Sequence, residues 1–213
     1  MHVQLTWATP NAEELIVKMA RVSAPKNQDN MDTAPRLLRY LIKHKHWSPF
    51  EMANMCVEIE TTRAISPQIL RHRSFSFQEF SQRYADTNEL GSAVIPHLRR
   101  QDQKNRQNSI DDLSSDLVAN YYRRISELYE NSEHLYREMV SNGIAKECAR
   151  SILPLSTQTR LFMNGTLRSW IHYLDLRCSN GTQLEHQQIA RAIRQIFCEQ
   201  FPIIGEAVFS ADQ

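Results

Sequence analysis

The chain has 213 residues and a formal net charge of +1, from 25 Lys and Arg against 24 Asp and Glu. Hydrophobic residues make up 41% of it and charged residues 23%, which is usual for a soluble globular protein with a sizeable core. The near-neutral charge argues against a general nucleic-acid coat protein, which is typically strongly basic, but it allows a local basic pocket.

The amino-terminal residues show no sign of a targeting segment. Residues 1–22, MHVQLTWATPNAEELIVKMARV, contain neither a long apolar run nor a small-residue cleavage site, so we expect no secretory signal. No run in the chain approaches the roughly 18 apolar residues of a membrane-spanning helix. We therefore expect a cytoplasmic protein with no membrane partner.

The first half of the chain alternates between helical and extended patterns. Asn11 is expected to cap the first helix, and Pro49 disfavours helix at the residue before it. Met55, Val57 and Ile59 alternate with polar residues, which is typical of a strand. The elements predicted here are helices over 11–23, 33–45 and 62–71, a polar loop over 24–32, a strand over 52–61, and a strand or extended arm over 76–84.

The second half is dominated by helical patterns. Asn142-Gly143 is a typical helix end, and the segment 179–182 reads as a turn. The elements predicted here are a loop over 86–108, helices over 110–141, 144–152, 165–178 and 183–200, and a strand over 157–164. With no internal repeat or linker, the predicted fold class is α+β. We expect a mixed or antiparallel sheet flanked by long helices, in a single domain over 1–213.

Positive charge is concentrated in the stretch RHRSFSFQEFSQRY, residues 71–84. Arg71, His72 and Arg73, near a helix end, point about 100° apart and can reach in three directions. Ser81 and Arg83 share one face of an extended segment, where a hydroxyl and a planar guanidinium suit a phosphate. The residues alone leave three interpretations open: a surface helix end with salt bridges, for example to Glu79, a nucleic-acid contact, or a site for a small anionic ligand.

Other residues limit the chemistry. The five glycines are too far apart for a Rossmann or phosphate-loop motif. The four cysteines lack metal-ligand spacing, so we predict no metal site and buried thiols, with Cys148 as the candidate for a reactive one. Arg168 and Arg177 would lie about 180° apart around one helix and about 13.5 Å along it. They are therefore expected to face different ligands or different subunits.

The motif formed by Arg71-His72-Arg73, seven residues, Ser81, one residue and Arg83 resembles the signature of the flavin-dependent thymidylate synthase family. Further resemblance covers roughly residues 10–205. It includes ARVS at 20–23, HKHWSPFE at 44–51, the segment 145–177 and QLEHQQIA at 183–190.

The resemblance implies an enzyme that transfers a methylene group to dUMP and reduces it to the methyl group of dTMP. It implies FAD as the bound cofactor, with NADPH and 5,10-methylenetetrahydrofolate as co-substrates and tetrahydrofolate as a product. No enzyme nucleophile would attack the uracil. The family also implies a homotetramer whose sites are shared between subunits.

Position by position, the resemblance implies two sets of site residues. The flavin side would comprise Ser48, Arg71, His72, Arg73, Glu79, Thr166, Arg168 and His172. The dUMP side would comprise Gln68, Arg71, Glu79, Phe80, Ser81, Gln82, Arg83, Arg150 and Arg177, with residues 80–82 acting largely through backbone N–H groups. Arg177 would be the activating, catalytic residue, and Ser81 would contact the phosphate rather than act as a nucleophile.

Some positions depart from the common family pattern. Gln82 stands where glycine is frequent, and Thr166 and His172 stand where other members have Asn. Two alternatives stay open: a nucleic-acid-binding module that uses the 71–83 stretch with the basic run 99–106, and a catalytically inactive homologue. The presence of five arginines at key family positions argues against the latter; they are Arg71, Arg73, Arg83, Arg150 and Arg177.

Overall fold

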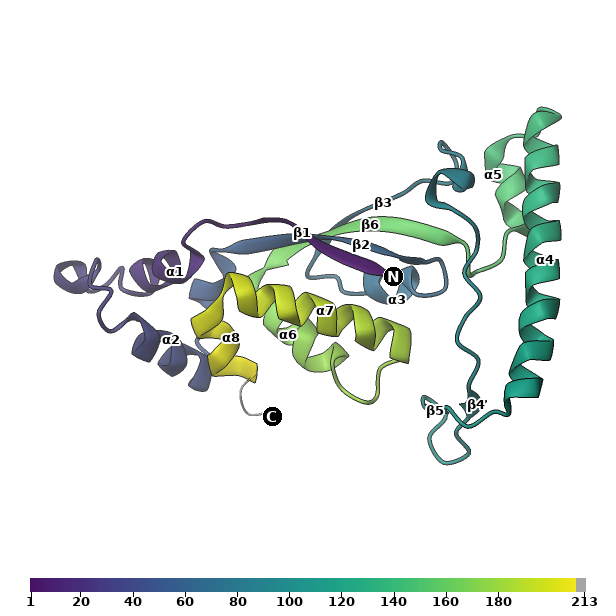
Figure 1. Cartoon of the computed structure of the whole chain (residues 1–213). Helices are drawn as coiled ribbons and strands as arrows, with labels where there is room; N and C mark the ends of the chain where they lie inside the picture. Colours follow the sequence, from purple (N-terminus) through teal and green to yellow (C-terminus); the bar gives the residue numbers. More distant parts are fainter. Residues whose placement is uncertain (210–213) are drawn as a thin grey trace.

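A computed structural model of the chain describes residues 1–209, except for the side chain of Asn88. Its centre is a four-stranded sheet in the order β1-β2-β6-β3, and every neighbouring pair is antiparallel (Figure 1). The strands are β1 (His2–Ala8), β2 (Asn54–Thr62), β3 (Ser76–Glu79) and β6 (Gln158–Thr166). The predicted fold class, α+β with an antiparallel sheet and flanking helices, is confirmed.

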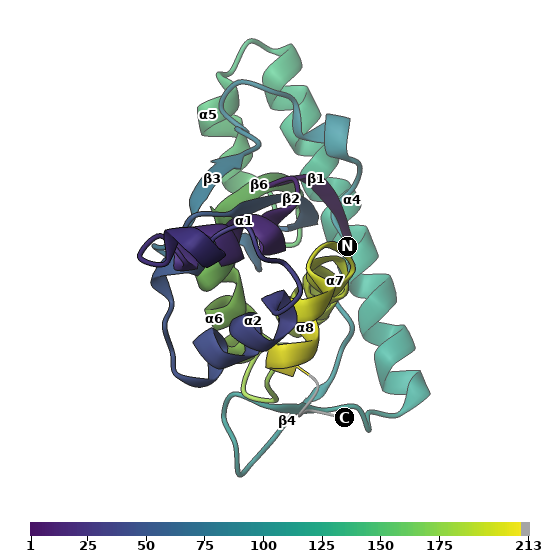
Figure 2. The ribbon, with the colours of Figure 1, turned by 90° about the vertical axis from the view of Figure 1, so that its left-hand side faces the viewer.

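One face of the sheet carries the core. Met55, Val57 and Ile59 of β2 are fully buried, as are Leu161 and Met163 of β6, because alternate residues of a strand point to the same face. Helices α6 (Leu167–Arg177) and α7 (Leu184–Gln200) lie against this face (Figures 1 and 2). The indole N–H of Trp170 on α6 donates to the Met55 carbonyl over 2.9 Å, which ties helix to sheet.

The remaining elements lie at the two ends of the sheet. At one end are α1 (Ala12–Ala20), η1 (Pro25–Asn27), α2 (Ala34–Lys43), η2 (Ser48–Glu51) and α8 (Pro202–Phe209). At the other end are η3 (Thr87–Leu90), β4 (Arg100–Gln101), β5 (Ser109–Ile110), α4 (Ser115–Ser141), α5 (Lys146–Ala149) and η4 (Arg150–Ile152). The short helix α3 (Ser66–Leu70) follows β2. Within residues 1–209, no helix is both long and apolar enough to cross a membrane.

Several element boundaries differ from the predictions for local reasons. Asn11 adopts a left-handed conformation at φ 49° and makes no side-chain cap, so the capping prediction was wrong. Helix 62–71 is shorter than predicted because β2 pairs with β6 as far as Thr62, and α3 starts only at Ser66, just before Pro67. The predicted loop 86–108 holds η3 and a strand, β4, that pairs with β5. The sequence patterns did not indicate β1 or α8.

Gly165 is the tightest point between β6 and the aromatic core. A Cβ atom there would lie 2.6 Å from Cε1 of Phe75. The Phe75 ring is held edge-on against Trp170, with centroids 4.7 Å apart, so it has little freedom to move away. We conclude that only glycine fits at this position without displacing the core.

Gly165→Ala should lower the free energy of unfolding by about 1–3 kcal/mol, because overpacking forces the aromatic rings from their positions. Denaturant titration at one fixed protein concentration would measure the loss. Gly181→Ala is the matched control, since a Cβ atom there meets nothing within 4 Å. Equal stability of the two variants would contradict this account of the core.

Candidate active site

The centre of the candidate site is a hydrogen bond between Arg177, the last residue of α6, and His72, just after α3. Nε of Arg177 donates to Nε2 of His72 over 2.9 Å. A guanidinium stays protonated and only donates, so Nε2 of His72 must be an acceptor. His72 is therefore a neutral imidazole with its proton on Nδ1.

A buried pair of residues lies behind this bond. Tyr173 of α6 and His186 of α7 are both fully buried, and the Tyr173 hydroxyl is 3.0 Å from Nε2 of His186. The His72 ring meets the Tyr173 ring edge-on, with centroids 4.8 Å apart. Nδ1 of His186 is buried with no hydrogen-bond partner among the described residues. The pair forms a polar floor under His72.

Burial keeps His72 and the floor beneath it uncharged. Burial lowers the pKa of His72 to about 4, with further lowering from the charge of Arg177 and then from His172. Burial, with Arg177 and then His72, likewise lowers the pKa of His186 to about 4. Burial also raises the pKa of Tyr173. At neutral pH, Arg177 is thus the charged member of this group of four.

A hollow of about 590 Å³, here called the Arg168 hollow, opens beside the first half of α6. Its wall includes Trp47, Glu51, Ser74, Arg168 and His172. Arg168 forms an ion pair with Glu51, which joins α6 to η2. This volume lies within the range of about 300–1,000 Å³ that is usual for ligand sites.

Thr166 has a structural task at the start of α6. Its hydroxyl accepts a hydrogen bond from the Ser169 N–H over 3.2 Å and so caps the helix. Ser48 lies in η2, next to Trp47 and close in sequence to Glu51 of the Arg168 hollow. The predicted flavin residues Arg168 and His172 therefore share one hollow, whereas Ser48 and Thr166 are not among its lining residues.

A second hollow of about 350 Å³, here called the Arg150 hollow, is lined by residues of α5, of η4 and of the segment 153–157 that leads to β6. Its lining includes Arg63, Arg150 and Gln82, which is 6% exposed. Arg83 beside it pairs with Glu147 over 3.2 Å. Two arginines and one carboxylate, Glu147, therefore line the hollow, and a third arginine, Arg83, is held beside it by that carboxylate, an arrangement that suits an anion.

Glu79 sits next to this hollow and is engaged within its own chain. Its carboxylate pairs with Arg63 over 2.6 Å and accepts a hydrogen bond from the Thr159 hydroxyl over 3.0 Å. The salt bridge considered for Glu79 therefore exists, but its partner comes from outside the 71–84 stretch. The backbone N–H of Phe80 donates to the Arg160 carbonyl over 2.8 Å, so this N–H is not available to a phosphate as was expected.

The structure thus places the predicted residues in three groups. His72 and Arg177 meet at the end of α6, Arg168 and His172 line one hollow, and Gln82 and Arg150 line another. Ser81 lies two residues beyond the end of β3. Gln68 donates to Gln183 at the start of α7, and Arg71 and Arg73 are exposed. Arg168 and Arg177 have different surroundings, in line with their spacing.

The cysteines are less buried than predicted. Cys56 is buried in β2, but Cys148 is exposed on the short helix α5, and Cys178 and Cys198 are half-buried. The prediction of buried thiols was therefore wrong for Cys148. Across the described part of the chain, no three His, Cys, Asp or Glu side chains are grouped to hold a metal ion.

Sequence reasoning missed several contributors to the site. Tyr173 and His186 lie within matched segments, and their helical positions could have marked them as inward-facing. Glu51 was visible as the last residue of HKHWSPFE but was given no role. Arg63 lies in none of the matched segments, because it reaches the site only through the folding of the sheet. Gln183 was visible as part of QLEHQQIA but was given no role.

Comparisons with known proteins show which family the chain belongs to. A family model described as "Thymidylate synthase complementing protein" matches residues 4–203. The chain belongs to this family. A relative from Paramecium bursaria Chlorella virus 1, named "Probable flavin-dependent thymidylate synthase", is 54% identical over 198 residues, 92% of this chain and 90% of the relative. The "Flavin-dependent thymidylate synthase" of Synechocystis sp. is 53% identical over 196 residues, 92% of this chain and 89% of that one.

Similar solved structures are consistent with this family. The UMP/dUMP methylase PolB from Streptomyces cacaoi bound with 5-Br dUMP is similar, with a TM-score of 0.86, 27% identity and coverage of 99% of this chain and 94% of that one. The structure of the same methylase bound with 5-Br UMP has a TM-score of 0.86 and 28% identity, and the match covers 99% of this chain and 93% of that one. The resemblance to flavin-dependent thymidylate synthases is confirmed, and the chain is an enzyme of that family. The nucleic-acid alternative gains no support from these relatives.

The depressed pKa of His186 predicts a specific pH dependence of stability. The unfolded chain protonates this imidazole near its ordinary value of 6.5, and the folded chain only near 4. Its contribution to stability is therefore full above pH 6.5 and is lost as pH falls from 6.5 to about 4. Each such histidine contributes up to about 1.4 kcal/mol per pH unit to the slope of the free energy of unfolding against pH in this range.

His186→Gln should therefore flatten the fall in the free energy of unfolding over this pH range, as measured by denaturant titration at several pH values. Tyr173→Phe is the matched control, because it removes the same hydrogen bond but leaves the histidine. Identical slopes in the native protein and His186→Gln would show that His186 titrates normally when folded.

Proposed function

We propose that this enzyme makes dTMP by reductive methylation of dUMP. A methylene group would pass from 5,10-methylenetetrahydrofolate to carbon 5 of the uracil and be reduced to a methyl group. NADPH would be the source of the hydride, and tetrahydrofolate would be released. FAD, when bound, would supply the hydride-transfer chemistry. No side chain of the enzyme would attack the uracil.

The observation that carries the proposal is the convergence of two matched segments. His72 and Arg177 are 105 residues apart in the chain and 2.9 Å apart in space. The bond to His72 uses Nε of Arg177, so the two Nη groups form the part of the guanidinium that would face the uracil. There they would stabilise negative charge as the ring becomes nucleophilic or accepts hydride.

The Arg168 hollow suits FAD by the chemistry of its lining. Trp47 and His172 offer planar rings, Arg168 offers a guanidinium for phosphate oxygens, and Ser74 offers a hydroxyl. Ser48, Thr166 and Glu79 would complete the flavin side, together with Arg71, His72 and Arg73. In this proposal the hollow would orient the cofactor along α6, the helix that ends at Arg177.

The dUMP phosphate would bind at the Arg150 hollow. Arg83 and Arg150 supply charge there, Ser81 supplies a hydroxyl, and buried Gln82 has an Nε2 with no partner among the described residues. Such an orphaned donor is costly unless a ligand or water satisfies it. The N–H of Phe80 is already bonded to Arg160, so Phe80 would only hold Ser81 and Gln82 in place. Glu79, Gln68, Arg71 and Arg177 would complete the dUMP side.

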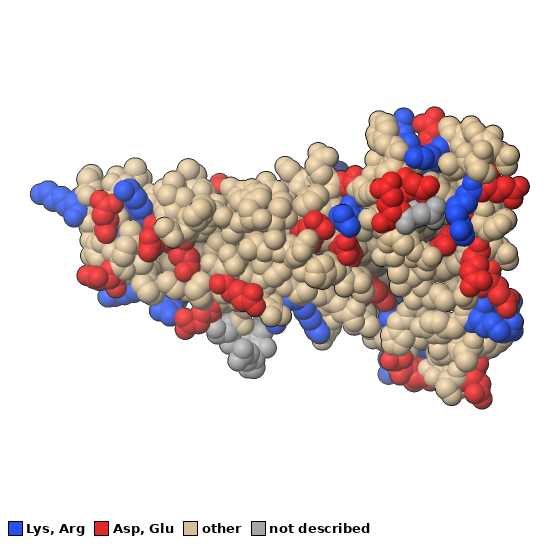
Figure 3. All heavy atoms as spheres, turned by 45° about the horizontal axis from the view of Figure 1, so that its top comes forward, with Lys and Arg blue, Asp and Glu red and all other residues tan. Residues whose placement is uncertain are grey.

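The enzyme would act as a homotetramer with shared sites. Helix α4 carries an exposed apolar stripe at helical spacing, formed by Leu117, Tyr121, Leu128 and Leu135. The outer face of the sheet, turned forward in Figure 3, is largely uncharged in its middle and includes exposed Trp7 and Phe162. Both surfaces suit contact with further copies. We place the enzyme in the cytoplasm, with neither nucleic acid nor a membrane as partner.

The purified protein should show the yellow absorption band of oxidised flavin, alone or after incubation with FAD. Under anaerobic conditions NADPH should bleach this band, and dUMP should make the bleaching faster, because the nucleotide completes the site. A protein that stays colourless after incubation with FAD would overturn the proposed function. A flavoprotein whose reduction ignores dUMP would overturn the assignment of the nucleotide.

Arg177→Ala should retain FAD but lower the rate of dTMP formation by about a hundredfold or more, as expected when a preorganised donor is removed. Bound flavin would be measured by absorbance and dTMP by chromatography. Arg177→Lys should restore only part of the rate, since it keeps the charge but not the planar fork. Arg39→Ala, which breaks an exposed ion pair with Glu206, serves as the control. Turnover of Arg177→Ala at the native rate would show that this role is wrong.

A further inference from the structure

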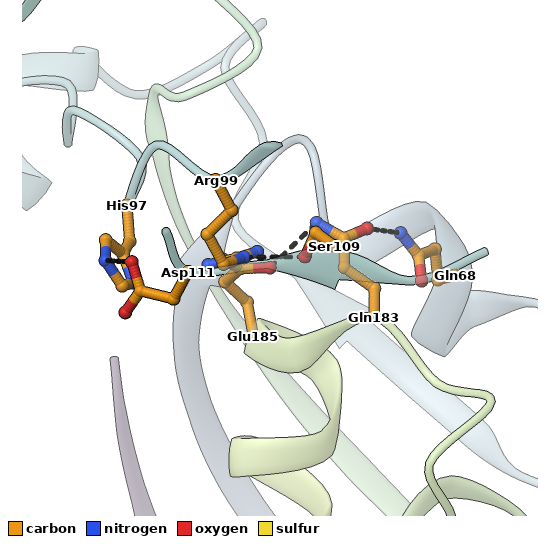
Figure 4. Close-up of polar contacts among 7 residues, drawn as sticks. All are labelled: Gln68, His97, Arg99, Ser109, Asp111, Gln183 and Glu185. Carbon is orange, nitrogen blue, oxygen red and sulfur yellow. Dashed lines mark hydrogen bonds and ion pairs between the residues drawn. The ribbon is translucent and has the colours of Figure 1, made fainter. Parts of the chain in front are cut away.

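A row of hydrogen bonds runs from the segment before β4 to Gln68 (Figure 4). Nε2 of Gln68 donates to Oε1 of Gln183 over 2.7 Å, and Nε2 of Gln183 donates to Oε2 of Glu185 over 2.9 Å. Nη2 of Arg99 donates to Oε1 of Glu185 over 2.7 Å, and Nε of Arg99 donates to the Ser109 hydroxyl over 2.8 Å. We call Arg99, Glu185 and Gln183 the Arg99 relay.

The charged end of the relay is well shielded. The side chains of Arg99 and Glu185 are 10% and 17% exposed, so water competes little for their ion pair. The nearby ion pair of His97 and Asp111 is more exposed, at 50% and 66%. Burial acts to raise the pKa of Glu185, but the hydrogen bond from Arg99 and other donors outweigh it, and the net pKa is lowered. Glu185 is therefore an ionised carboxylate at neutral pH.

This charge sets the direction of every bond that follows. An ionised carboxylate only accepts hydrogen bonds, so Gln183 must turn its Nε2 toward Glu185. Oε1 of Gln183 then faces Gln68 and requires a donor from it. Gln68 must in turn present Nε2, because a flipped amide would set two oxygens against each other. The Oε1 of Gln68 is thereby left for another partner.

We propose, resting on the function proposed above, that the Arg99 relay positions Gln68 and fixes which end of its amide meets dUMP. A glutamine on a surface helix would otherwise offer either its oxygen or its NH₂ group to a ligand. With its direction set, Gln68 presents its oxygen to an N–H or O–H donor of the nucleotide. Gln183 and Glu185 are positioning residues, since they act through Gln68 and not on the nucleotide.

The test measures dUMP affinity of the FAD-loaded protein by calorimetry, with steady-state kinetics alongside. Gln183→Leu removes the middle of the relay, and Glu185→Gln replaces the acceptor-only group with an amide of the same shape. Each should weaken dUMP binding and raise its KM by about three- to tenfold, as expected for one misdirected hydrogen bond. The kcat should change less than twofold. Gln188→Leu is the control. Gln188 lines the same hollow as Gln183 and Glu185 but is not part of the relay, so the same Gln-to-Leu change there should leave dUMP binding as it is.

A double-mutant cycle separates positioning from a purely structural role. If Gln183 acts through Gln68, Gln68→Ala with Gln183→Leu should bind dUMP no more weakly than Gln68→Ala alone. Additive losses, or native affinity in both relay variants, would overturn the proposal. Thermal unfolding checks that each variant is folded, and Glu185→Gln preserves the test if Gln183→Leu does not fold. A native protein that fails to bind dUMP would overturn the proposed function itself, which is a different result from unaffected variants.

Discussion

The antiparallel pairing of β2 with β6 is the constraint on which the site depends. The two strands match residue by residue from Asn54 opposite Thr166 to Thr62 opposite Gln158. Because β2 leads into α3 and β6 leads into α6, this register decides where His72 and Arg177 lie relative to each other. A shift of one residue would turn the apolar face of a strand outward, so burial of the core holds the register and, with it, the Arg177–His72 bond.

Electrostatically, the site places one permanent charge on an uncharged floor. His72, Tyr173 and His186 are polar enough to hydrogen-bond, yet burial keeps all three neutral at physiological pH. The Arg177 guanidinium is therefore not offset by a carboxylate in this group, and its field is directed toward whatever ligand approaches. Two of the other site arginines differ, since Arg168 and Arg83 are already paired with Glu51 and Glu147. This contrast favours Arg177 as the residue that responds to charge developing on a substrate.

Much of this arrangement could be predicted from the sequence, and the remainder depended on tertiary contacts. Alternation at Met55, Val57 and Ile59 predicted β2, and the 71–83 motif marked the chemistry. Sequence could not show that Glu79 is held by Arg63, because that ion pair depends on where β3 lies in the sheet. Nor could it show that the N–H of Phe80 is taken by β6. Strand β1 was missed because its exposed and half-buried residues give an edge strand a weak pattern.

Helix α4 has a consequence for how much active enzyme a cell obtains. Among its 27 residues Tyr136 is the one that is buried, so this helix takes little of its stability from its own chain. If other copies cover its apolar stripe, ordering of the helix and association of the subunits form one equilibrium governed by mass action. The amount of working enzyme then rises more steeply than in proportion to the amount of chain made. Expression level would act as a threshold for activity.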